Sequence, residues 1–244
     1  MGCWKCRCYY RIVGNSLKIL VTQPRGKERL VNAFQEAGAD IVPYLSEDVK
    51  LIVPVVDEEL WFFSHSKNWF KNKGVEVLVA STGTIDTCRD KAEFYKFCRR
   101  HGFGVPETAQ FEAIIKPRFG KGSRGQIRID RSYISQEIIT WPEYSIDYYH
   151  DEYITSIIPR ERLKVINGES QEARFENSKT LIDEARRLGQ ELNLEYHNVM
   201  QCFFDGKNIK WIEVNPRYGG GSWLTFEAFN SPEHVLEHLK EIVK

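Results

Sequence analysis

The segment WIEVNPRYGGGS, residues 211–222, places three different polar side chains at alternate positions and then runs into glycines. In a β-strand, side chains two residues apart point to the same face, so Glu213, Asn215 and Arg217 share one face and the apolar residues between them face a core. Carboxylate and amide oxygens are ligands for a hard metal ion, and a guanidinium binds anions. The pattern therefore indicates a strand that holds a metal and an anion together.

A second segment, IKPRFGKGSRGQ (residues 115–126), could bind that anion. Its glycines have the spacing G-x-G-x-x-G, but a dinucleotide fingerprint needs a helix after the loop, whereas the following QIRID is typical of a strand. The loop is therefore predicted to join two strands, as a flap whose backbone N–H groups close over phosphates. Its positive charges are Lys116, Arg118, Lys121 and Arg124. The alternative is a glycine hairpin with solvated charges.

The composition is that of a soluble globular protein. Of the 244 residues, 42% are hydrophobic and 28% are charged, and 34 basic residues balance 34 acidic ones. This balance argues against a protein that coats nucleic acid, and no apolar run approaches the length of a membrane span. We therefore expect a cytoplasmic protein without nucleic-acid or membrane partners. Because symmetric dimers are the commonest oligomers, a homodimer stays open.

Three of the six cysteines fall within the first eight residues, MGCWKCRC. A closed zinc site needs four ligands, and no matching cluster of cysteine or histidine follows. Six cysteines in a chain of this length do not form a disulfide framework either. We expect residues 1–16 to be a disordered leader outside the fold. Because no disulfide framework is indicated, we also expect a reducing location.

The elements that must position these segments fall into two groups. In residues 17–85, the runs LKILVTQ, ADIVP, VKLIVPV and VEVLVAS indicate strands, and KERLVNAFQEAG indicates a helix that stops at Gly38. This alternation predicts a small parallel α/β domain. One amphipathic helix is predicted over Asp86–His101, closed by Gly102.

Beyond Phe111 the pattern changes to strand-like runs with short turns, which predicts an antiparallel sheet. The runs are AIIKP, QIRID, SYISQEI, EYSIDYYH, EYITSII, NVMQCFF and KWIEVN. A helix is predicted over Ser178–Leu192. The last helix is predicted to open with Ser231 as N-cap and Pro232 at its first position.

Seven segments occur in an order that resembles the ATP-grasp superfamily, in particular the branch typified by the ATP-binding modules of carbamoyl-phosphate synthetase. They are VVDEELW, CRDKAEFYKF, IIKPRFGKGSRG, ISQEIITWPEYSID, IPRERLKVINGES, NVMQ and IEVNPRYGGGS. The resemblance extends from Ile19 to Val243. It implies a pre-ATP-grasp α/β domain (17–85) followed by an ATP-grasp domain of two α+β subdomains (86–244). The nucleotide-binding subdomain would span about 105–145 and the metal-binding subdomain about 146–244.

The resemblance also implies an ATP site. Lys91 and Lys116 would reach the phosphates, and Glu143 would accept hydrogen bonds from the ribose hydroxyls. The hinge beside adenine would be formed by Glu137, Ile138 and Ile139. The flap above the phosphates would consist of Gly120, Lys121, Gly122, Ser123, Arg124 and Gly125.

The resemblance further implies a site for Mg²⁺, or Mn²⁺ in its place, formed by Glu213 and Asn215 with Gln201 as the third ligand. The geometry sets a condition. A tight turn at Asp205-Gly206 would put Gln201 and Glu213 on opposite faces, so the site requires an odd-length loop or a bulge.

Arg217 would bind the transferring phosphoryl group, with Lys116 as the second catalytic cation. The other implied residues belong to the substrate. Arg160 and Arg162 could hold an acidic group, and Gly219 and Gly220 make room for the molecule. Glu58 and Glu59 either face the same cleft or are solvated surface charges.

The resemblance implies an ATP-dependent carboxylate–amine ligase that proceeds through an acyl phosphate and acts on small-molecule carboxylate and amine substrates. Two alternatives remain: a phosphotransferase or synthetase that stops at an acyl or carbonyl phosphate, and a nucleotide-binding subunit without turnover. The chain is far shorter than carbamoyl-phosphate synthetase, and nothing in it marks a site for the amine.

Overall fold

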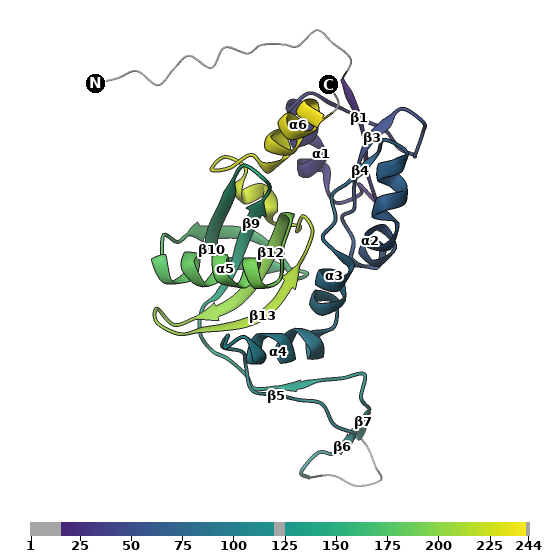
Figure 1. The fold of residues 1–244 in the computed structure, drawn as a ribbon. Helices are drawn as coiled ribbons and strands as arrows, with labels where there is room; N and C mark the ends of the chain where they lie inside the picture. The colour runs from purple at the N-terminus through teal and green to yellow at the C-terminus, as the bar shows by residue number, and fades with distance from the viewer. Residues whose placement is uncertain (1–15, 120–124, 243–244) are drawn as a thin grey trace, which may run out of the picture.

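The structure, a computed structural model, describes residues 16–119 and 125–242 (Figure 1). The predicted leader, apart from Ser16, and five residues of the predicted flap, Gly120–Arg124, lie outside the described residues. Within the described part, no helix is long and apolar enough to cross a membrane.

The N-terminal part is a four-stranded parallel sheet, as the sequence predicts, and helices cover both of its faces. The strand order is β2-β1-β3-β4, with bounds Leu17–Val21 (β1), Ala39–Ile41 (β2), Val49–Val53 (β3) and Glu76–Val77 (β4). Helices α1 (Glu28–Glu36) and α6 (Ser231–Ile242) cover one face, and α2 (Asp57–Asn72) covers the other (Figure 1). Helix α2 was not identified from the sequence.

The helix predicted over Asp86–His101 is two helices, α3 (Thr82–Arg89) and α4 (Lys91–Arg100). The prediction of a single helix is wrong because Asp90 has an extended backbone, and its carboxylate accepts hydrogen bonds from the backbone N–H groups of Ala92 and Glu93. Asp90 is therefore an N-cap that starts a new helix. The break places Lys91 at the first position of α4. Helix α3 also spans the predicted domain boundary at residue 85.

The C-terminal part is a five-stranded antiparallel sheet of order β11-β10-β9-β12-β13. The bounds are Glu143–His150 (β9), Thr155–Ile166 (β10), Glu169–Phe175 (β11), Tyr196–Phe204 (β12) and Ile209–Asn215 (β13). Helices α3, α4 and α5 (Lys179–Glu191) pack on one face around Trp211 and Ile146. Helix α5 begins after Ser178, whose hydroxyl accepts a hydrogen bond from the backbone of Leu181, as predicted. The opposite face of the sheet carries polar side chains.

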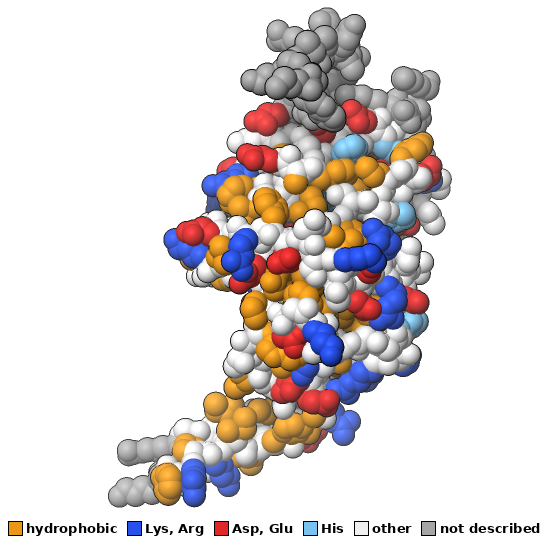
Figure 2. Space-filling model, turned by 90° about the vertical axis from the view of Figure 1, so that its left-hand side faces the viewer, with side chains coloured by type: hydrophobic (Ala, Val, Ile, Leu, Met, Phe, Trp, Pro, Cys, Tyr) orange, Lys and Arg blue, Asp and Glu red, His pale blue; other side chains and the backbone are white. Residues whose placement is uncertain are grey.

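Between these two parts, residues 108–136 form an arm that projects from the bottom of the molecule (Figure 1). It contains two small antiparallel pairs, Thr108–Ala109 with Ser135–Gln136 (β5 and β8) and Ala113–Ile115 with Ile127–Ile129 (β6 and β7). The glycine segment thus joins two strands, as predicted. Hydrophobic and basic side chains lie together on the arm (Figure 2), and the exposed hydrophobic ones include Ile114, Ile115, Phe119 and Ile127.

The predicted N-cap of the last helix is a second correction. Helix α6 begins at Ser231, but Asn230 Oδ1 accepts the hydrogen bond from the backbone of Glu233, at 3.4 Å. The hydroxyl of Ser231 lies 3.0 Å from Nδ1 of the buried His197 instead. Asn230 is therefore the cap, and Ser231 ties the helix to the C-terminal sheet. Before α6, a short 3-10 helix (Ser222–Thr225) follows the glycine run.

Candidate functional site

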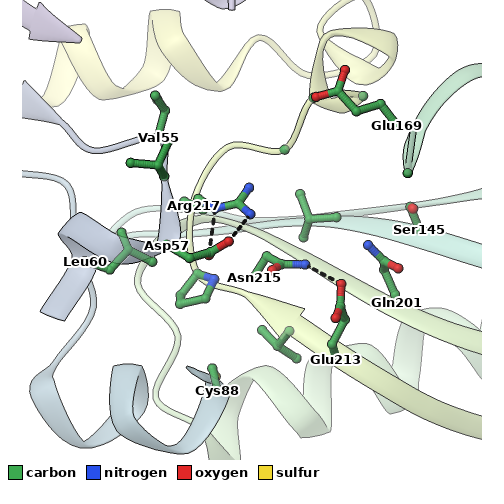
Figure 3. A pocket seen from close by; sticks show the side chains of 18 of the residues that line it. Val55, Asp57, Leu60, Cys88, Ser145, Glu169, Gln201, Glu213, Asn215 and Arg217 are labelled. Atoms are coloured by element: carbon green, nitrogen blue, oxygen red, sulfur yellow. Dashed lines mark hydrogen bonds and ion pairs between the residues drawn. The ribbon is translucent and has the colours of Figure 1, made fainter. Parts of the chain in front are cut away.

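A cavity of about 520 Å³ lies between the polar face of the C-terminal sheet and the N-terminal part. Figure 3 shows Gln201 of β12, Glu213 and Asn215 of β13, and Arg217, which follows β13, pointing into it. The cavity brings together nine residues that the sequence predicted: Lys91, Arg160, Arg162, Gln201, Glu213, Asn215, Arg217, Gly219 and Gly220.

The pairing of the strands places four polar residues in one row across the sheet. Arg160 pairs with Ser145, Ser145 with Gln201, and Gln201 with Glu213. The last pairing depends on a β-bulge. The hairpin closes with Phe204 opposite Ile209, and the register then shifts by one residue beyond Cys202. This bulge meets the condition set from the sequence, since the side chains of Gln201 and Glu213 both point into the cavity (Figure 3).

The predicted metal ligands already hold a cation. Lys91 Nζ forms an ion pair with Glu213 Oε2, and Asn215 Nδ2 donates to Glu213 Oε1 at 3.0 Å. Burial opposes ionisation of Glu213, but Lys91 and Asn215 outweigh it and lower the pKa of this carboxyl. In residues 16–119 and 125–242, no group of three or more His, Cys, Asp or Glu side chains could hold a metal. The donor set here is one carboxylate and two amides.

Arg217 connects the polar face of the C-terminal sheet to the N-terminal part. Its guanidinium binds both oxygens of Asp57, Nε to Oδ1 at 2.8 Å and Nη2 to Oδ2 at 2.5 Å (Figure 3). Asp57 is the first residue of α2 and is half-exposed. A carboxylate thus occupies the anion-binding side of Arg217, with the bidentate geometry that a phosphoryl group would also use.

The guanidinium of Arg162 is fully engaged. It forms an ion pair with Glu143, approaches Gln201 Oε1 at 3.3 Å, and donates to Ser170 Oγ at 3.0 Å and to the carbonyl of Gly168 at 2.5 Å. Arg162 therefore connects the predicted ribose ligand, Glu143, to the predicted metal ligand, Gln201. All three of its guanidinium nitrogens have acceptors within the protein, whereas only Nε of Arg160 has one among the described residues.

Arg160 belongs to a buried network. Its Nε donates to Asp147 Oδ2 at 2.8 Å, and the other carboxylate oxygen lies 3.1 Å from Nε2 of His197. Burial opposes ionisation of Asp147, but Arg160 and His197 outweigh it and lower the pKa of Asp147 to about 2. His197 Nε2 also lies 3.0 Å from the hydroxyl of Ser222, which accepts the backbone N–H of Gly219 at 2.9 Å. The network thus fixes Arg160 relative to the glycine run.

Of the predicted adenine and flap residues, those that the structure describes do not line the cavity. Lys116 is exposed at the end of β6, and the side chain of Ile138 is 92% exposed. Glu137 accepts the backbone N–H of Glu107 at 2.9 Å and forms an ion pair with Lys210. Ile139 is half-buried, Gly125 has a φ of +71°, and Gly120, Lys121, Gly122, Ser123 and Arg124 lie outside the described residues.

Several residues of the site were not found from the sequence. Asp147 could have been, because it alternates with Glu143 and Ser145 in one strand and so shares their face. Asp57 and Glu169 carried no such signal, because both belong to other elements that approach the cavity only in the folded chain. Glu58, which the sequence left open, is exposed and lines the cavity, whereas Glu59 accepts a hydrogen bond from Gln23 at 2.9 Å.

Comparison with known proteins agrees with this architecture. Residues 131–243 match a family model described as ATP-grasp in the biosynthetic pathway with Ter operon. The large chain of carbamoyl phosphate synthase from Pseudomonas aeruginosa is 24% identical over 65% of this chain, and the match spans only 19% of that longer protein.

Solved structures show the same fold at low sequence identity. D-alanyl-alanine synthetase A from Vibrio cholerae superposes with a TM-score of 0.64 and 10% identity, over 93% of this chain and 98% of that one. An L-amino acid ligase from Bacillus licheniformis has a TM-score of 0.63 and 14% identity, over 92% of this chain and 74% of that one. D-alanine–D-alanine ligase from Bacillus anthracis, complexed with ATP, has a TM-score of 0.59 and 13% identity, over 93% of this chain and 99% of that one. Residues 131–243 therefore belong to the ATP-grasp superfamily, and the described fold is that of its solved members.

Proposed function

We propose that the protein is an ATP-dependent, Mg²⁺-requiring ligase that joins a carboxylate to an amine through an acyl phosphate. The observation that carries this proposal is the row across the sheet, in which Gln201 and Glu213 stand opposite each other beside Asn215. An ATP-dependent ligase must bind a divalent cation and phosphate oxygens next to each other, and this cavity offers such a place. Two of the proteins with the same fold are ligases of amino acids, which agrees with that reaction class.

The donor set fits Mg²⁺ bound together with phosphates. One carboxylate and two amide oxygens leave coordination positions for phosphate oxygens and water, which is how Mg²⁺ binds at such sites. The chemistry supplied by the ion is the neutralisation of charge on the β- and γ-phosphates. The ion pair between Lys91 and Glu213 supports the assignment, because an ammonium already occupies the place of a cation.

The cationic side chains would exchange partners when ATP binds. Lys91 would leave Glu213 for a phosphate oxygen, and Arg217 would exchange Asp57 for the transferring phosphoryl group. Lys116 and the glycine flap would approach the phosphates from the arm. Preorganised cations next to the developing charge are the main protein contribution to phosphoryl transfer.

The nucleotide itself would lie between the arm and the C-terminal sheet. We assign adenine to the hinge formed by Glu137, Ile138 and Ile139, and the ribose hydroxyls to Glu143. The ion pair of Glu143 with Arg162 supports this role, since it holds the carboxylate in place to accept hydrogen bonds.

The reaction then has two balanced steps. An oxygen of the substrate carboxylate attacks the γ-phosphorus, the bond from that phosphorus to the β-bridging oxygen breaks, and ADP leaves. The amine nitrogen next attacks the carbonyl carbon of the acyl phosphate, the carbon–oxygen bond breaks, and phosphate leaves while the nitrogen loses a proton. A phosphotransferase would stop after the first step. A binding subunit would perform neither, and the presence of Lys116, Glu213 and Asn215 argues against it.

An isotope experiment tests the acyl phosphate. With an ¹⁸O-labelled carboxylate substrate, Mg·ATP and an amine, the ligase mechanism transfers one ¹⁸O atom into inorganic phosphate for each amide formed. A phosphotransferase would instead retain the label in an acyl phosphate that accumulates whether or not the amine is present. Amide formation with unlabelled phosphate would contradict the proposal.

A further inference from the structure

Arg160 and Glu213 lie at the two ends of the row of polar residues across the sheet. The guanidinium of Arg160 has hydrogen-bond donors without a partner among the described residues. The Arg160 side chain is 2% exposed, and its Nη1 has no hydrogen-bond partner among the described residues. Leaving a buried donor unpaired costs about 1–3 kcal/mol, so native structures rarely do so without a reason. Because Arg160 lines the cavity, a bound molecule can supply the missing acceptor.

The free edge of this guanidinium faces the glycine run. A Cβ atom on Gly221 would lie 3.3 Å from Arg160 Nη1 and 3.2 Å from Nη2, so a larger residue at this position would crowd both nitrogens. Nε, on the other side, is already bound to Asp147. Nη1 and Nη2 together have the geometry that binds a carboxylate with two parallel hydrogen bonds.

A carboxylate lies beside this anion site. A Cβ atom on Gly220 would overlap with Oε1 of Glu169, so the Glu169 carboxylate reaches to the residue next to Gly221. Because the Cα atoms of consecutive residues such as Gly220 and Gly221 are about 3.8 Å apart, the Glu169 carboxylate lies close to the Arg160 guanidinium. Among the described residues Glu169 forms one ion pair, with Lys27 Nζ, which is long at 3.4 Å, and its side chain is 45% exposed. Glu169 can therefore accept a second cation at little cost.

We propose that this end of the cavity binds the head group of an α-amino acid, with its carboxylate on Arg160 and its ammonium on Glu169. The assignment rests on the proposed function, because it concerns the substrate of the same cavity. A phosphate group is disfavoured, since a dianion on Arg160 would lie next to the negative charge of Glu169. Arg160 is three strand spacings, roughly 14 Å along the row, from Glu213, so the head group is held away from the end where phosphoryl transfer takes place.

The test is direct binding without nucleotide. The twenty free L-amino acids are screened by saturation-transfer NMR, each beside its C-terminal amide and its N-acetyl derivative. At least one free amino acid is expected to bind, with affinity lowered at least about ten-fold by either modification, because each removes one charged partner. Equal binding of the amide or of the N-acetyl derivative would overturn the assignment.

Variants connect the binding to the two residues. Glu169→Gln is expected to lower the affinity for the amino acid at least about ten-fold. Glu172 is an exposed acid on the same strand, and Glu172→Gln is expected to leave this affinity unchanged. Gly221→Ala is expected to weaken it as well, by covering the edge of Arg160. Unchanged affinity in Glu169→Gln would contradict the proposal.

Binding of Mg·ATP to the same samples separates this proposal from the function on which it rests. If Mg·ATP binds and no amino acid does, the head-group site is wrong and the ligase proposal stands. If Mg·ATP does not bind, the proposed function fails, whatever the amino acids do.

Discussion

Gln201 stands directly opposite Glu213 because the register shifts between β12 and β13, so that Ile212 is an extra residue in the last strand. Without this bulge the four-residue loop would pair Gln201 with Ile212, and the carboxylate of Glu213 would turn to the face covered by helices. Bulges of this kind redirect side chains at functional sites. Here the bulge brings an amide and a carboxylate to the same side of the sheet, where Asn215 and Lys91 meet them.

The first prediction concerns Glu213. Glu213→Gln keeps the size of the side chain but removes the only carboxylate among the three proposed metal ligands. We expect ATP turnover to fall by at least about two orders of magnitude, because the ion neutralises charge in the transition state. The Mg²⁺ concentration for half-maximal turnover should rise as well. Turnover measured against Mg²⁺ concentration checks both, and a variant with unchanged Mg²⁺ dependence would remove Glu213 from the metal site.

The second prediction concerns the pair of Arg217 and Asp57. Asp57→Asn should strengthen the binding of Mg·ATP by a few-fold, because Arg217 no longer has to leave a carboxylate for the phosphoryl group. Arg217→Lys should strongly lower the rate of ATP turnover, since lysine lacks the planar pair of donors. Isothermal titration with a non-hydrolysable ATP analogue measures the first effect. Weaker nucleotide binding in Asp57→Asn would mean that the pair orders the site instead of competing with ATP.

The third prediction concerns the pH dependence of stability through Asp147. Because the pKa of Asp147 is lowered from 3.8 to about 2 in the folded state, its carboxylate stabilises the fold above pH 3.8, and this stabilisation is lost as the pH falls towards 2. Asp147→Asn should lower the free energy of unfolding at pH 7 by about 3–5 kcal/mol, since Arg160 is then buried without a counter-charge.

The measurement for Asp147 is urea denaturation at pH 7 and at several values between pH 4 and pH 2. The variant should lose less stability than the wild type across that range. Asp183→Asn is the control, because Asp183 is exposed and should leave the unfolding free energy nearly unchanged. An equal loss of stability in Asp147→Asn and the wild type between pH 4 and pH 2 would show that Asp147 does not carry the effect.

The fourth prediction compares two helical glycines. A Cβ atom on Gly189 of α5 would overlap with the buried ring of Tyr148, so Gly189→Ala should lower the free energy of unfolding by about 1–3 kcal/mol. Gly83 of α3 has open space around the position of a Cβ atom, and Gly83→Ala should raise it by about 0.5–1 kcal/mol through helix propensity alone. Thermal or chemical unfolding of the pair checks this. If both variants were stabilised, the packing of α5 against β9 would be looser than described.

Much of the fold and part of the site could be predicted because the signals were local. The alternation of Glu213, Asn215 and Arg217 on one strand is such a signal, and so is the run of strands around the glycine segment. The break at Asp90 was missed because the apolar period continues across it, although aspartate is itself a capping residue. Helix α2 was missed because Trp61 and Trp69 remain exposed and blur its apolar face.

The remaining features depend on contacts between distant parts of the chain. Arg217 and Asp57 are 160 positions apart, and no pattern within either segment specifies their pairing. The same holds for Lys91 with Glu213, 122 positions apart. The register shift at Ile212 could be stated as a requirement but not located, since one extra residue leaves no mark in a strand of alternating pattern.

The most direct test of the central claim is ADP release from Mg·ATP in the presence of pools of carboxylic acids and amino acids, with the double variant Glu213→Ala/Asn215→Ala as control. The ligase proposal predicts that at least one pool stimulates ADP release several-fold and that the double variant loses this stimulation while remaining folded. Stimulated release that persists in the double variant would place the reaction elsewhere. If no pool stimulates release although Mg·ATP raises the melting temperature, the protein binds the nucleotide without acting as a ligase on these acids, and the central claim is contradicted.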